Sequence, residues 1–263
     1  MSAVLSASAA PDSSTLPPSR APSQGILYGL GLGPGDADLM TVRAHRLLGN
    51  ASHVAYFRKA GRPGQARRIV EGLLPVGVVE IAMEYPVTTE IALDDPAYNL
   101  ALSSFYADCA RRLSALSDAG HAVVVLCEGD PFFYGSFMHL HARLVHSHPV
   151  QVVPAITGMS GAWTATGQPI TWGDDVLTVL MGTLPEATLA HHMAAADALV
   201  VMKIGRHIDK VRRALASAGR LPEAWLVEYA CMPAQRVLRL IDAPERVTPY
   251  FSIVLVHGQG RRP

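Results

Sequence analysis

The sequence is organised around the stretch Ile26-Leu27-Tyr28-Gly29-Leu30-Gly31-Leu32-Gly33-Pro34-Gly35-Asp36, in which an apolar run passes directly into glycines at every second position. Glycine has no Cβ, so such a backbone can approach a ligand closely and adopt dihedral angles that other residues avoid. Open α/β sheets place their ligands beyond the carboxyl ends of strands. The stretch therefore predicts a buried strand that ends in a ligand-binding loop, with a helix after it.

On the C-terminal side of this stretch, apolar segments with the periodicity of strands and helices alternate. Their spacing predicts helices at 38–49, 65–74 and from 96 onward, and a further helix after residue 131. It predicts strands at 53–57, 76–83, 121–127 and 150–153. Such alternation is typical of a parallel sheet covered by helices on both faces.

The second half of the chain has a different pattern. Two expected strands, 176–181 and 198–202, are each followed by a helix, but three more strands then follow without a helix between them, at 225–229, 236–240 and 251–256. This order predicts a mixed sheet in a second α/β domain, with the boundary near Pro154. We therefore divide the chain into an N-terminal domain, 25–154, and a C-terminal domain, 155–263.

Residues 1–24 are rich in Ser, Ala and Pro and contain few large apolar side chains. A basic start followed by an apolar segment would indicate a signal peptide, and that pattern does not occur. We interpret these residues as a disordered N-terminal extension.

The overall composition limits the classes of partner. Lys and Arg together number 22, as do Asp and Glu, so the formal net charge is zero. Proteins that bind nucleic acid or anionic membranes normally carry a basic excess, and no apolar run approaches the roughly 18 residues that a membrane-spanning helix needs. Three scattered cysteines fit a reducing compartment. We expect a soluble, cytoplasmic protein that binds a small molecule.

Several loops follow the ends of expected strands, at 33–36, 128–134, 154–161 and 181–183. Each alone is an ordinary turn rich in Gly, Pro or Asp. Their convergence would make a ligand site in the cleft between the two domains.

A dinucleotide is the obvious alternative ligand for the first loop. A dinucleotide fingerprint requires a differently spaced third glycine and an acidic residue about 20 positions later. Here Pro34 removes a backbone donor, Asp36 places a negative charge where phosphate would bind, and the strand at 53–57 has no Asp or Glu. A ligand with a positive centre and no phosphate, such as S-adenosylmethionine, fits this loop better.

Three motifs resemble those of the tetrapyrrole (precorrin/cobalt-precorrin) methylase family. They are Gly31-Leu32-Gly33-Pro34-Gly35-Asp36, Glu128-Gly129-Asp130-Pro131-Phe132-Phe133-Tyr134-Gly135 and Val153-Pro154-Ala155-Ile156-Thr157-Gly158-Met159-Ser160. Ala155 stands where the family usually has glycine. Four further stretches resemble the branch of the family that methylates carbon 20 of precorrin-2: 83–90, 135–138, 202–206 and 250–254. The resemblance covers residues 26–257.

This resemblance implies a two-domain α/β enzyme of cobalamin biosynthesis, usually a homodimer, that binds S-adenosyl-L-methionine in the cleft between its domains. The activity implied is methylation of precorrin-2 at carbon 20 to give precorrin-3A. The alternatives are that cobalt-precorrin-2 is the substrate, or that the chain is a non-catalytic tetrapyrrole-binding protein. The family's cofactor contacts correspond to Pro34, Glu128, Gly129, Asp130, Phe133, Thr157, Gly158, Met181 and Ala230. Relatives often have glycine in place of Ala230.

Two further groups of side chains are candidates for contact with the substrate. Glu84, Tyr85 and Glu90 belong to an expected polar and aromatic loop, and the first two are our catalytic candidates; the alternative is a loop that only faces solvent. Arg58, Lys59 and Arg62 begin a basic cluster that continues to Arg67 and Arg68, and arginine suits the binding of substrate carboxylates. The alternative is a solvated helix face.

Two residues or groups of residues have ambiguous roles. Asp130 is as well suited to stabilise a turn as to bind a ligand. His139, His141, His146 and His148 have spacings that place their side chains on different faces of a helix. A metal site needs three or four convergent ligands, so we expect no structural metal.

Overall fold

We describe the fold from a computed structural model, in which residues 24–86 and 96–262 are described. The expected extension at 1–24 therefore lies almost entirely outside the described residues, and so does Glu90. No helix in the described part of the chain is both long enough and apolar enough to cross a membrane.

The first sheet has five strands in the order β3-β2-β4-β1-β5, and all of its neighbouring strands are parallel. Its strands are β1 (Leu27–Gly31), β2 (His53–Lys59), β3 (Val79–Tyr85), β4 (Val123–Cys127) and β5 (Val150–Val153). Every residue of β4 is buried, as expected for an apolar strand inside a parallel sheet. Because β1 lies between β4 and β5, the loops that follow these three strands are neighbours.

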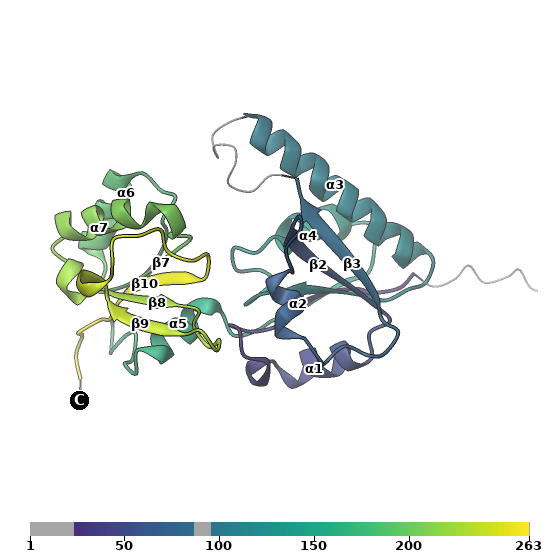
Figure 1. The fold of residues 1–263 in the computed structure, drawn as a ribbon, viewed down its shortest axis with the longest axis horizontal. Helices are drawn as coiled ribbons and strands as arrows, with labels where there is room; N and C mark the ends of the chain where they lie inside the picture. The colour runs from purple at the N-terminus through teal and green to yellow at the C-terminus, as the bar shows by residue number, and fades with distance from the viewer. Residues whose placement is uncertain (1–23, 87–95, 263) are drawn as a thin grey trace, which may run out of the picture.

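Helices cover both faces of the first sheet (Figure 1), which confirms the predicted arrangement. One face is covered by α3 (Pro96–Asp118) and α4 (Phe137–Leu144), which pack on alternate residues of the strands, such as Val123 and Val125. The other is covered by α1 (Val42–Gly49) and α2 (Gln65–Ile69), which pack on the intervening residues.

The second sheet is mixed, as predicted, with the strand order β6-β7-β10-β8-β9. Only β6 and β7 are parallel; the other pairs are antiparallel. Its strands are β6 (Leu177–Met181), β7 (Ala198–Met202), β8 (Trp225–Glu228), β9 (Arg236–Arg239) and β10 (Ser252–Val256).

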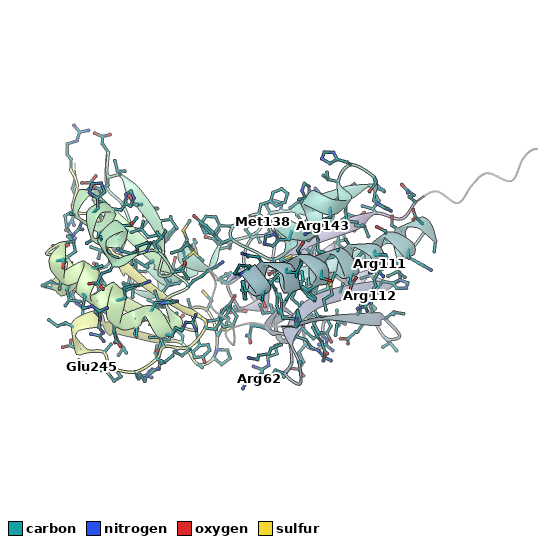
Figure 2. All side chains as sticks on the ribbon, turned by 90° about the horizontal axis from the view of Figure 1, so that it is seen from above. Arg62, Arg111, Arg112, Met138, Arg143 and Glu245 are labelled. Carbon is teal, nitrogen blue, oxygen red and sulfur yellow. The ribbon has the colours of Figure 1, made fainter. Side chains whose placement is uncertain are left out.

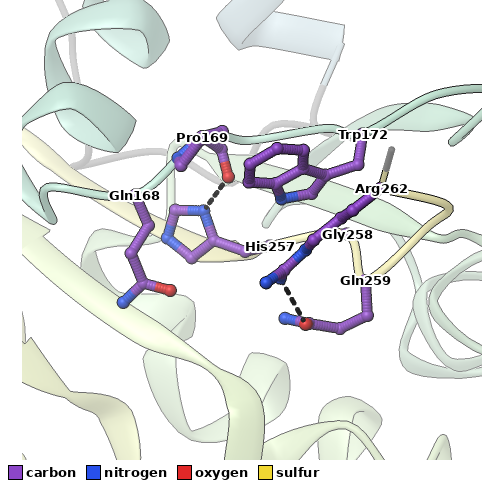
Figure 3. A pocket seen from close by; sticks show the side chains of 7 residues that line it. All are labelled: Gln168, Pro169, Trp172, His257, Gly258, Gln259 and Arg262. Carbon is purple, nitrogen blue, oxygen red and sulfur yellow. Dashed lines mark hydrogen bonds between the residues drawn. The ribbon is translucent and has the colours of Figure 1, made fainter.

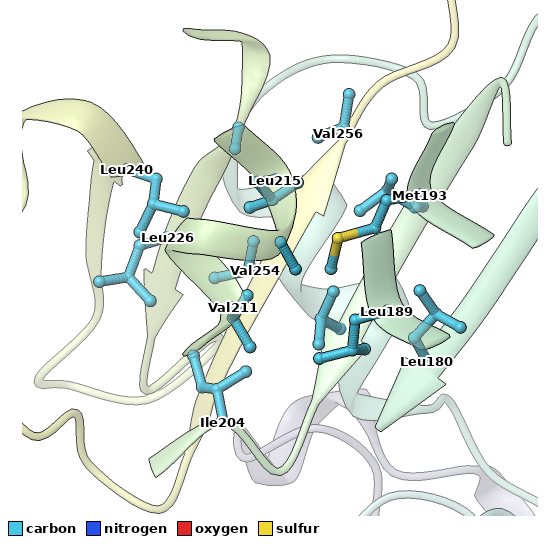
Figure 4. Packing of buried hydrophobic residues seen from close by; sticks show 14 of the residues in the cluster. Leu180, Leu189, Met193, Ile204, Val211, Leu215, Leu226, Leu240, Val254 and Val256 are labelled. Atoms are coloured by element: carbon cyan, nitrogen blue, oxygen red, sulfur yellow. The ribbon is translucent and has the colours of Figure 1, made fainter. Parts of the chain in front are cut away.

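Two helices cover one face of the second sheet and one helix covers the other. Figure 4 shows the apolar core under α6 (Glu186–Ala195) and α7 (Ile208–Ser217), where Leu189, Met193 and Val211 contact strand residues. On the opposite face, α5 (Gly158–Ala165) packs with Val200, Val227 and Leu255. The change from one sheet to the other therefore falls between β5 and α5.

Several element boundaries differ from the sequence-based prediction; the helix expected at 65–74, for example, ends at Ile69. Two of the differences bear on the site. The helix expected at 38–49 begins only at Val42, after a short 3-10 helix, because the Thr41 hydroxyl accepts a hydrogen bond from the Ala44 amide and so caps a new helix. The strand expected at 76–83 begins at Val79 and extends to Tyr85, which is paired with Lys59 of β2. The interpretation of Glu84 and Tyr85 as loop residues was therefore wrong.

Candidate functional site

The loops that follow β1, β4 and β5 meet at one edge of the first sheet, as predicted. Gly33 and Gly129 form an isolated bridge, in which the Gly129 amide donates to the Gly33 carbonyl at 2.8 Å. A Cβ at Gly31 would lie 2.5 Å from the Ala155 Cβ and 2.9 Å from the Gly129 carbonyl oxygen. Only glycine lets the three loops approach this closely.

Asp130 holds the second and third loops together. One oxygen of its carboxylate accepts a hydrogen bond from the Phe132 amide, and the other accepts one from the Ala155 amide, both at 2.9 Å. Both oxygens are therefore engaged by backbone donors, which favours the structural alternative for this side chain. Phe133 follows in the same loop, with its ring edge-on to that of Tyr134.

The third loop leads into α5 through Thr157. The Thr157 hydroxyl accepts a hydrogen bond from the Ser160 amide and caps the helix. A Cβ placed on the next residue, Gly158, would meet only the side chain of Ile253 in β10, at 3.9 Å. The start of α5 therefore faces the second sheet, and a Cβ at Gly158 would fit there without a clash.

The first loop also contacts the second half of the molecule. A Cβ at Gly161 of α5 would lie 2.8 Å from the Pro34 Cβ and 2.9 Å from the Cys231 sulfur. A Cβ at Gly35 would lie 3.2 Å from the carbonyl oxygen of Ala230. Two expected cofactor positions from different halves, Pro34 and Ala230, are thus brought to one junction.

Glu128 lies at the same edge of the sheet, directly after β4. Its carboxylate accepts a hydrogen bond from the Ala66 amide at 3.0 Å, and its side chain is exposed. Its charge acts on Tyr250 of the other half, and we call the space bordered by these two residues the gap between the halves. Protein on several sides still withdraws this carboxylate from bulk water, which raises the pKa of Glu128 above its ordinary value. A carboxylate with a raised pKa is a stronger base than an ordinary one.

Tyrosines from both halves surround the same space. Tyr250, just before β10, is 79 % exposed, but the surrounding protein and the charge of Glu128 raise its pKa to about 12. The Tyr85 hydroxyl forms a hydrogen bond with Ser136, and its ring lies against Phe57 and Phe105. Burial raises the pKa of Tyr85 well above its usual range, so both hydroxyls are protonated at neutral pH.

The other catalytic candidate, Glu84, does not join this group. Successive residues of a strand point to opposite faces, and the Glu84 carboxylate forms an ion pair with Arg58 of the neighbouring strand at 2.5 Å. Glu84 and Tyr85 therefore lie on opposite faces of β3, and the Glu84 carboxylate compensates the charge of Arg58.

The remaining basic candidates lie at and beyond the end of β2. Arg67 forms an ion pair with Glu80 at 2.7 Å. Lys59 and Arg62 are exposed, and Figure 2 shows Arg62 at the margin of the N-terminal half.

The second half contributes a loop from each of its two parallel strands. Met181 ends β6, and the adjacent Gly182 packs so tightly that a Cβ there would lie 3.0 Å from the Lys203 carbonyl oxygen. The Lys203 ammonium reaches back toward the first half and lies 6.0 Å from the centre of the Tyr134 ring. The edge of the second sheet that carries Met181 therefore faces the loop after β4.

Backbone strain is concentrated at these loops. Among the described residues other than glycine, only four have a positive φ: Tyr134, Lys203, Tyr229 and Cys231, with φ between 52° and 59°. All four lie in loops that follow β4, β7 or β8. Such conformations cost roughly 1–3 kcal/mol each and cluster at functional sites.

Three residues around the gap were not predicted individually: Ser136, Lys203 and Tyr250. The stretches 135–138, 202–206 and 250–254, which contain them, do resemble known motifs. The surroundings of Lys203 and Tyr250 depend on how the two halves meet, and the contact of Ser136 with Tyr85 depends on how the start of α4 lies beside β3. No spacing along the chain reveals either arrangement.

A separate pocket lies at the other end of β10, beside His257 (Figure 3). The buried His257 ring lies 2.9 Å from the Pro169 carbonyl oxygen and 3.0 Å from the Thr166 hydroxyl. Nearby, the Arg262 guanidinium stacks over Trp172. Within 24–86 and 96–262, no three His, Cys, Asp or Glu side chains are grouped as metal ligands would be.

Comparison with known proteins identifies relatives over most of the chain. The sequence pattern of the Tetrapyrrole (Corrin/Porphyrin) Methylases matches residues 26–241. A precorrin-2 C(20)-methyltransferase of Sinorhizobium sp is 50% identical over 91% of this chain and 98% of that protein. A cobalt-precorrin-2 C(20)-methyltransferase of Salmonella typhimurium is 29% identical over 89% of this chain and 97% of that protein. The cobalamin biosynthesis protein CobIJ of Mycobacterium tuberculosis is 45% identical over 91% of this chain, which spans 47% of CobIJ.

Solved structures share the fold. The cobalt precorrin-4 methyltransferase CbiF superposes with a TM-score of 0.68 at 21% identity, over 88% of this chain and 94% of that one. A uroporphyrin-III C-methyltransferase from Thermus thermophilus, complexed with S-adenosyl homocysteine, superposes with a TM-score of 0.62 at 24% identity, over 89% of this chain and 92% of that one.

Proposed function

Because this chain belongs to the tetrapyrrole (corrin/porphyrin) methylase family, we propose that it transfers a methyl group from S-adenosyl-L-methionine to carbon 20 of precorrin-2 in cobalamin biosynthesis. The observation that carries this proposal is the 50% identity over nearly the whole length of a relative with that name. The product would be precorrin-3A.

The loops at the junction fit a cofactor of this kind. When bound, S-adenosyl-L-methionine supplies an electrophilic methyl group on a positively charged sulfur. Neither packing nor a positive φ requires glycine at Gly158, so the lack of a side chain there is consistent with space kept for a ligand. The Glu128 carboxylate gives the gap a negative charge that suits a cation. We assign the cofactor to Pro34, Glu128, Gly129, Asp130, Phe133, Thr157, Gly158, Met181 and Ala230, with Asp130 acting through the loops that it joins.

The residues around the gap supply positioning and proton handling. The reacting carbon of a reduced tetrapyrrole is already nucleophilic, so alignment alone can contribute several kcal/mol, up to roughly 7–11 in ideal cases. Tyr85 and Tyr250 keep their protons and can donate hydrogen bonds to the substrate. Glu128, with its raised pKa, is the best-suited base for the proton that leaves the methylated carbon. Glu84 would act only by orienting Arg58.

The substrate carries eight carboxylates, and we propose that Arg58, Lys59 and Arg62 bind some of them. Arginine can form two parallel hydrogen bonds to a carboxylate. Replacing Arg62 with Ala should raise the KM for the tetrapyrrole and leave the affinity for the cofactor unchanged. Loss of both together would count against this role.

Incubation with S-adenosyl-L-methionine and precorrin-2, followed by mass spectrometry, tests the function. A gain of one methyl group at carbon 20 is expected. We favour the metal-free substrate because the relative named for it is 50% identical and the relative named for the cobalt form is 29% identical. Parallel assays with cobalt-loaded substrate test that choice. Binding of both ligands without methyl transfer would instead indicate a non-catalytic tetrapyrrole-binding protein.

We also propose that the protein is a cytoplasmic homodimer with domains at 25–154 and 155–263, and that neither nucleic acid nor a membrane is its partner. The domain boundary is supported by α5, whose buried Ala162 packs with the second sheet. Light scattering should give a solution mass of twice 28.1 kDa. A mass of 28.1 kDa would contradict the dimer.

A further inference from the structure

Lys203 and Tyr134 face each other from opposite halves of the molecule. Lys203 follows β7 and Tyr134 lies in the loop after β4, and the ammonium is 6.0 Å from the centre of the ring. Both residues have the left-handed backbone conformation, with φ of 54° and 55°. This conformation is strained for a residue with a Cβ, and proteins retain such strain mainly at ligand clamps, switches and active sites.

The Lys203 ammonium lacks a carboxylate partner within the described residues. Two other cations do have such a partner: Arg58 pairs with Glu84, and Arg246 pairs with the buried Glu228 at 2.8 Å. Partial withdrawal from water lowers the pKa of Lys203. Burial first, then the charge of Arg143 and last that of Lys203 lower the pKa of His139 on α4, so the Lys203 ammonium lies within electrostatic reach of this histidine. A partly desolvated charge without a counter-ion is unfavourable, so this position favours an anion.

The surroundings of Lys203 on the first half are aromatic and cationic. His139 stacks on Tyr106 with ring centres 4.5 Å apart, and the Arg143 guanidinium lies 5.8 Å from the centre of the same ring. Figure 2 places Arg143 and Met138 together on α4. Aromatic rings suit the flat, apolar parts of a ligand and the cations suit its charged parts.

We propose that Lys203 and Tyr134 form a subsite that binds one peripheral carboxylate of the tetrapyrrole. The inference rests on the proposed function and adds a specific anchor to it. The ammonium donates a hydrogen bond to the carboxylate, while the Tyr134 ring packs on the carbon chain that bears it. A tetrapyrrole with eight carboxylates needs many cations, and Lys203 is a cation that the described residues leave without an anion. The methionine carboxylate of the cofactor has the same chemistry, and the experiment separates the two sources.

The test compares Lys203→Met, Lys203→Arg and Lys210→Met with the wild type. Lys203→Met removes the charge with little change in length, and Lys203→Arg restores it. Lys210→Met removes the same charge from α7 and serves as the matched control. Each protein is titrated with uroporphyrin, a stable octacarboxylic tetrapyrrole, by fluorescence quenching, and with S-adenosylhomocysteine by calorimetry. Circular dichroism melting checks that each variant is folded.

We expect Lys203→Met to weaken uroporphyrin binding about tenfold, equivalent to about 1.4 kcal/mol, and to leave the affinity for S-adenosylhomocysteine unchanged. Lys203→Arg and Lys210→Met should bind uroporphyrin within about threefold of the wild type. The first variant keeps the positive charge at the subsite, and the second removes a charge that lies outside it. A loss confined to S-adenosylhomocysteine would assign the subsite to the cofactor and overturn the proposal. Unchanged binding of both ligands, or a wild type without affinity for uroporphyrin, would overturn it as well.

These readouts do not depend on turnover. A wild type that methylates precorrin-2, together with a Lys203→Met variant that binds uroporphyrin normally, would refute the subsite and leave the function intact. If the wild type did not methylate precorrin-2 but bound uroporphyrin, and the Lys203→Met variant bound it more weakly, the function would be refuted and the subsite would stand.

Discussion

Asp130 shows how a turn and a ligand site can depend on the same side chain. Its two carboxylate oxygens accept hydrogen bonds from the amides of Phe132 and Ala155. These bonds fix the distance between the loops after β4 and β5. Asp130 can therefore govern ligand binding without contacting the ligand.

Replacing Asp130 with Ala should lower the free energy of unfolding by about 2 kcal/mol, since hydrogen bonds to a charged group contribute roughly 1.5–3 kcal/mol each and water replaces part of the loss at a half-buried site. Asp130→Asn keeps one acceptor and should cost about half as much. Urea unfolding with an unchanged m-value measures the effect. Equal stabilities of wild type and Asp130→Ala would show that these hydrogen bonds do not support the fold.

Glu128 gives the stability of the protein a specific pH dependence. The pKa of its carboxyl group is raised in the folded state, so the folded protein binds this proton more tightly than the unfolded chain does. Ionisation therefore costs stability as the pH rises from the ordinary glutamate range through the raised pKa. Glu128→Gln cannot ionise, and its amide oxygen can still accept from Ala66. The melting temperature of Glu128→Gln relative to wild type should thus be higher at pH 8 than at pH 4.5. If the difference in melting temperature were the same at both pH values, or larger at pH 4.5, the pKa of Glu128 would not be raised in the folded state.

Tyr85 should act as a neutral hydroxyl. Because burial raises its pKa well above the usual range, Tyr85 stays protonated throughout the range in which the enzyme can be assayed. We expect Tyr85→Phe to lower kcat/KM by about tenfold, the value of one hydrogen bond of 1.4 kcal/mol, without changing the pH profile between pH 6 and 9. Ser136→Ala, which removes its hydrogen-bond partner, is the matched variant. Unchanged turnover of Tyr85→Phe would remove Tyr85 from the site.

At the scale of elements, strand order explains the site better than any single motif does. The loops after β4, β1 and β5 meet because these strands are neighbours and parallel, and α5 carries the third loop onto the second sheet. Gly161 of α5 is where this helix touches the first loop. A larger residue there must separate α5 from the first loop.

Gly161→Ala should therefore weaken S-adenosylhomocysteine binding by tenfold or more and lower the free energy of unfolding by about 1–3 kcal/mol, as overpacking does. Its Cβ would lie 2.8 Å from the Pro34 Cβ and 2.9 Å from the Cys231 sulfur, closer than carbon and sulfur atoms can pack. Gly49→Ala, at the end of α1, is the control, because a Cβ there meets no atom within 4 Å. Calorimetric titration measures the affinity, and an unaltered value for Gly161→Ala would indicate that the helix can shift freely.

The sequence was most informative for elements with strong periodicity or resemblance, and least informative for contacts across the sheets. Apolar periodicity was sufficient for the alternating strands and helices, the parallel first sheet and the mixed second sheet. It placed the end of β3 two residues early, because the pairing of Tyr85 with Lys59 depends on register with β2. That shift matters for the site: it places Glu84 and Tyr85 on opposite faces. The pairing of Lys203 with Tyr134 depends on how two distant loops face each other, which the local sequence does not encode.

At the scale of the whole molecule, each sheet has its own apolar cores, and the described contacts between the halves are few. They include Pro34 beside Gly161, Gly35 beside the Ala230 carbonyl oxygen, and a hydrogen bond from the Gln65 amide to the Met232 sulfur at 3.6 Å. Interfaces of this kind between domains usually permit relative motion. A ligand held by loops from both halves would therefore couple two otherwise independent units.

Calorimetry of the full chain should detect this coupling. Without ligand, we expect two overlapping unfolding transitions, because the cores under α6 and α7 and those of the first sheet share no residues. S-adenosylhomocysteine at 100 times its Kd should add about 2.7 kcal/mol to the stability of the state that binds it. Since binding requires both halves, this stabilisation should raise both transitions and merge them. NAD(H) is the control and should leave the trace unchanged, because Pro34 and Asp36 disfavour phosphate in the first loop. If S-adenosylhomocysteine raised only one transition, that half alone would hold the cofactor, and the site would not lie between the two sheets.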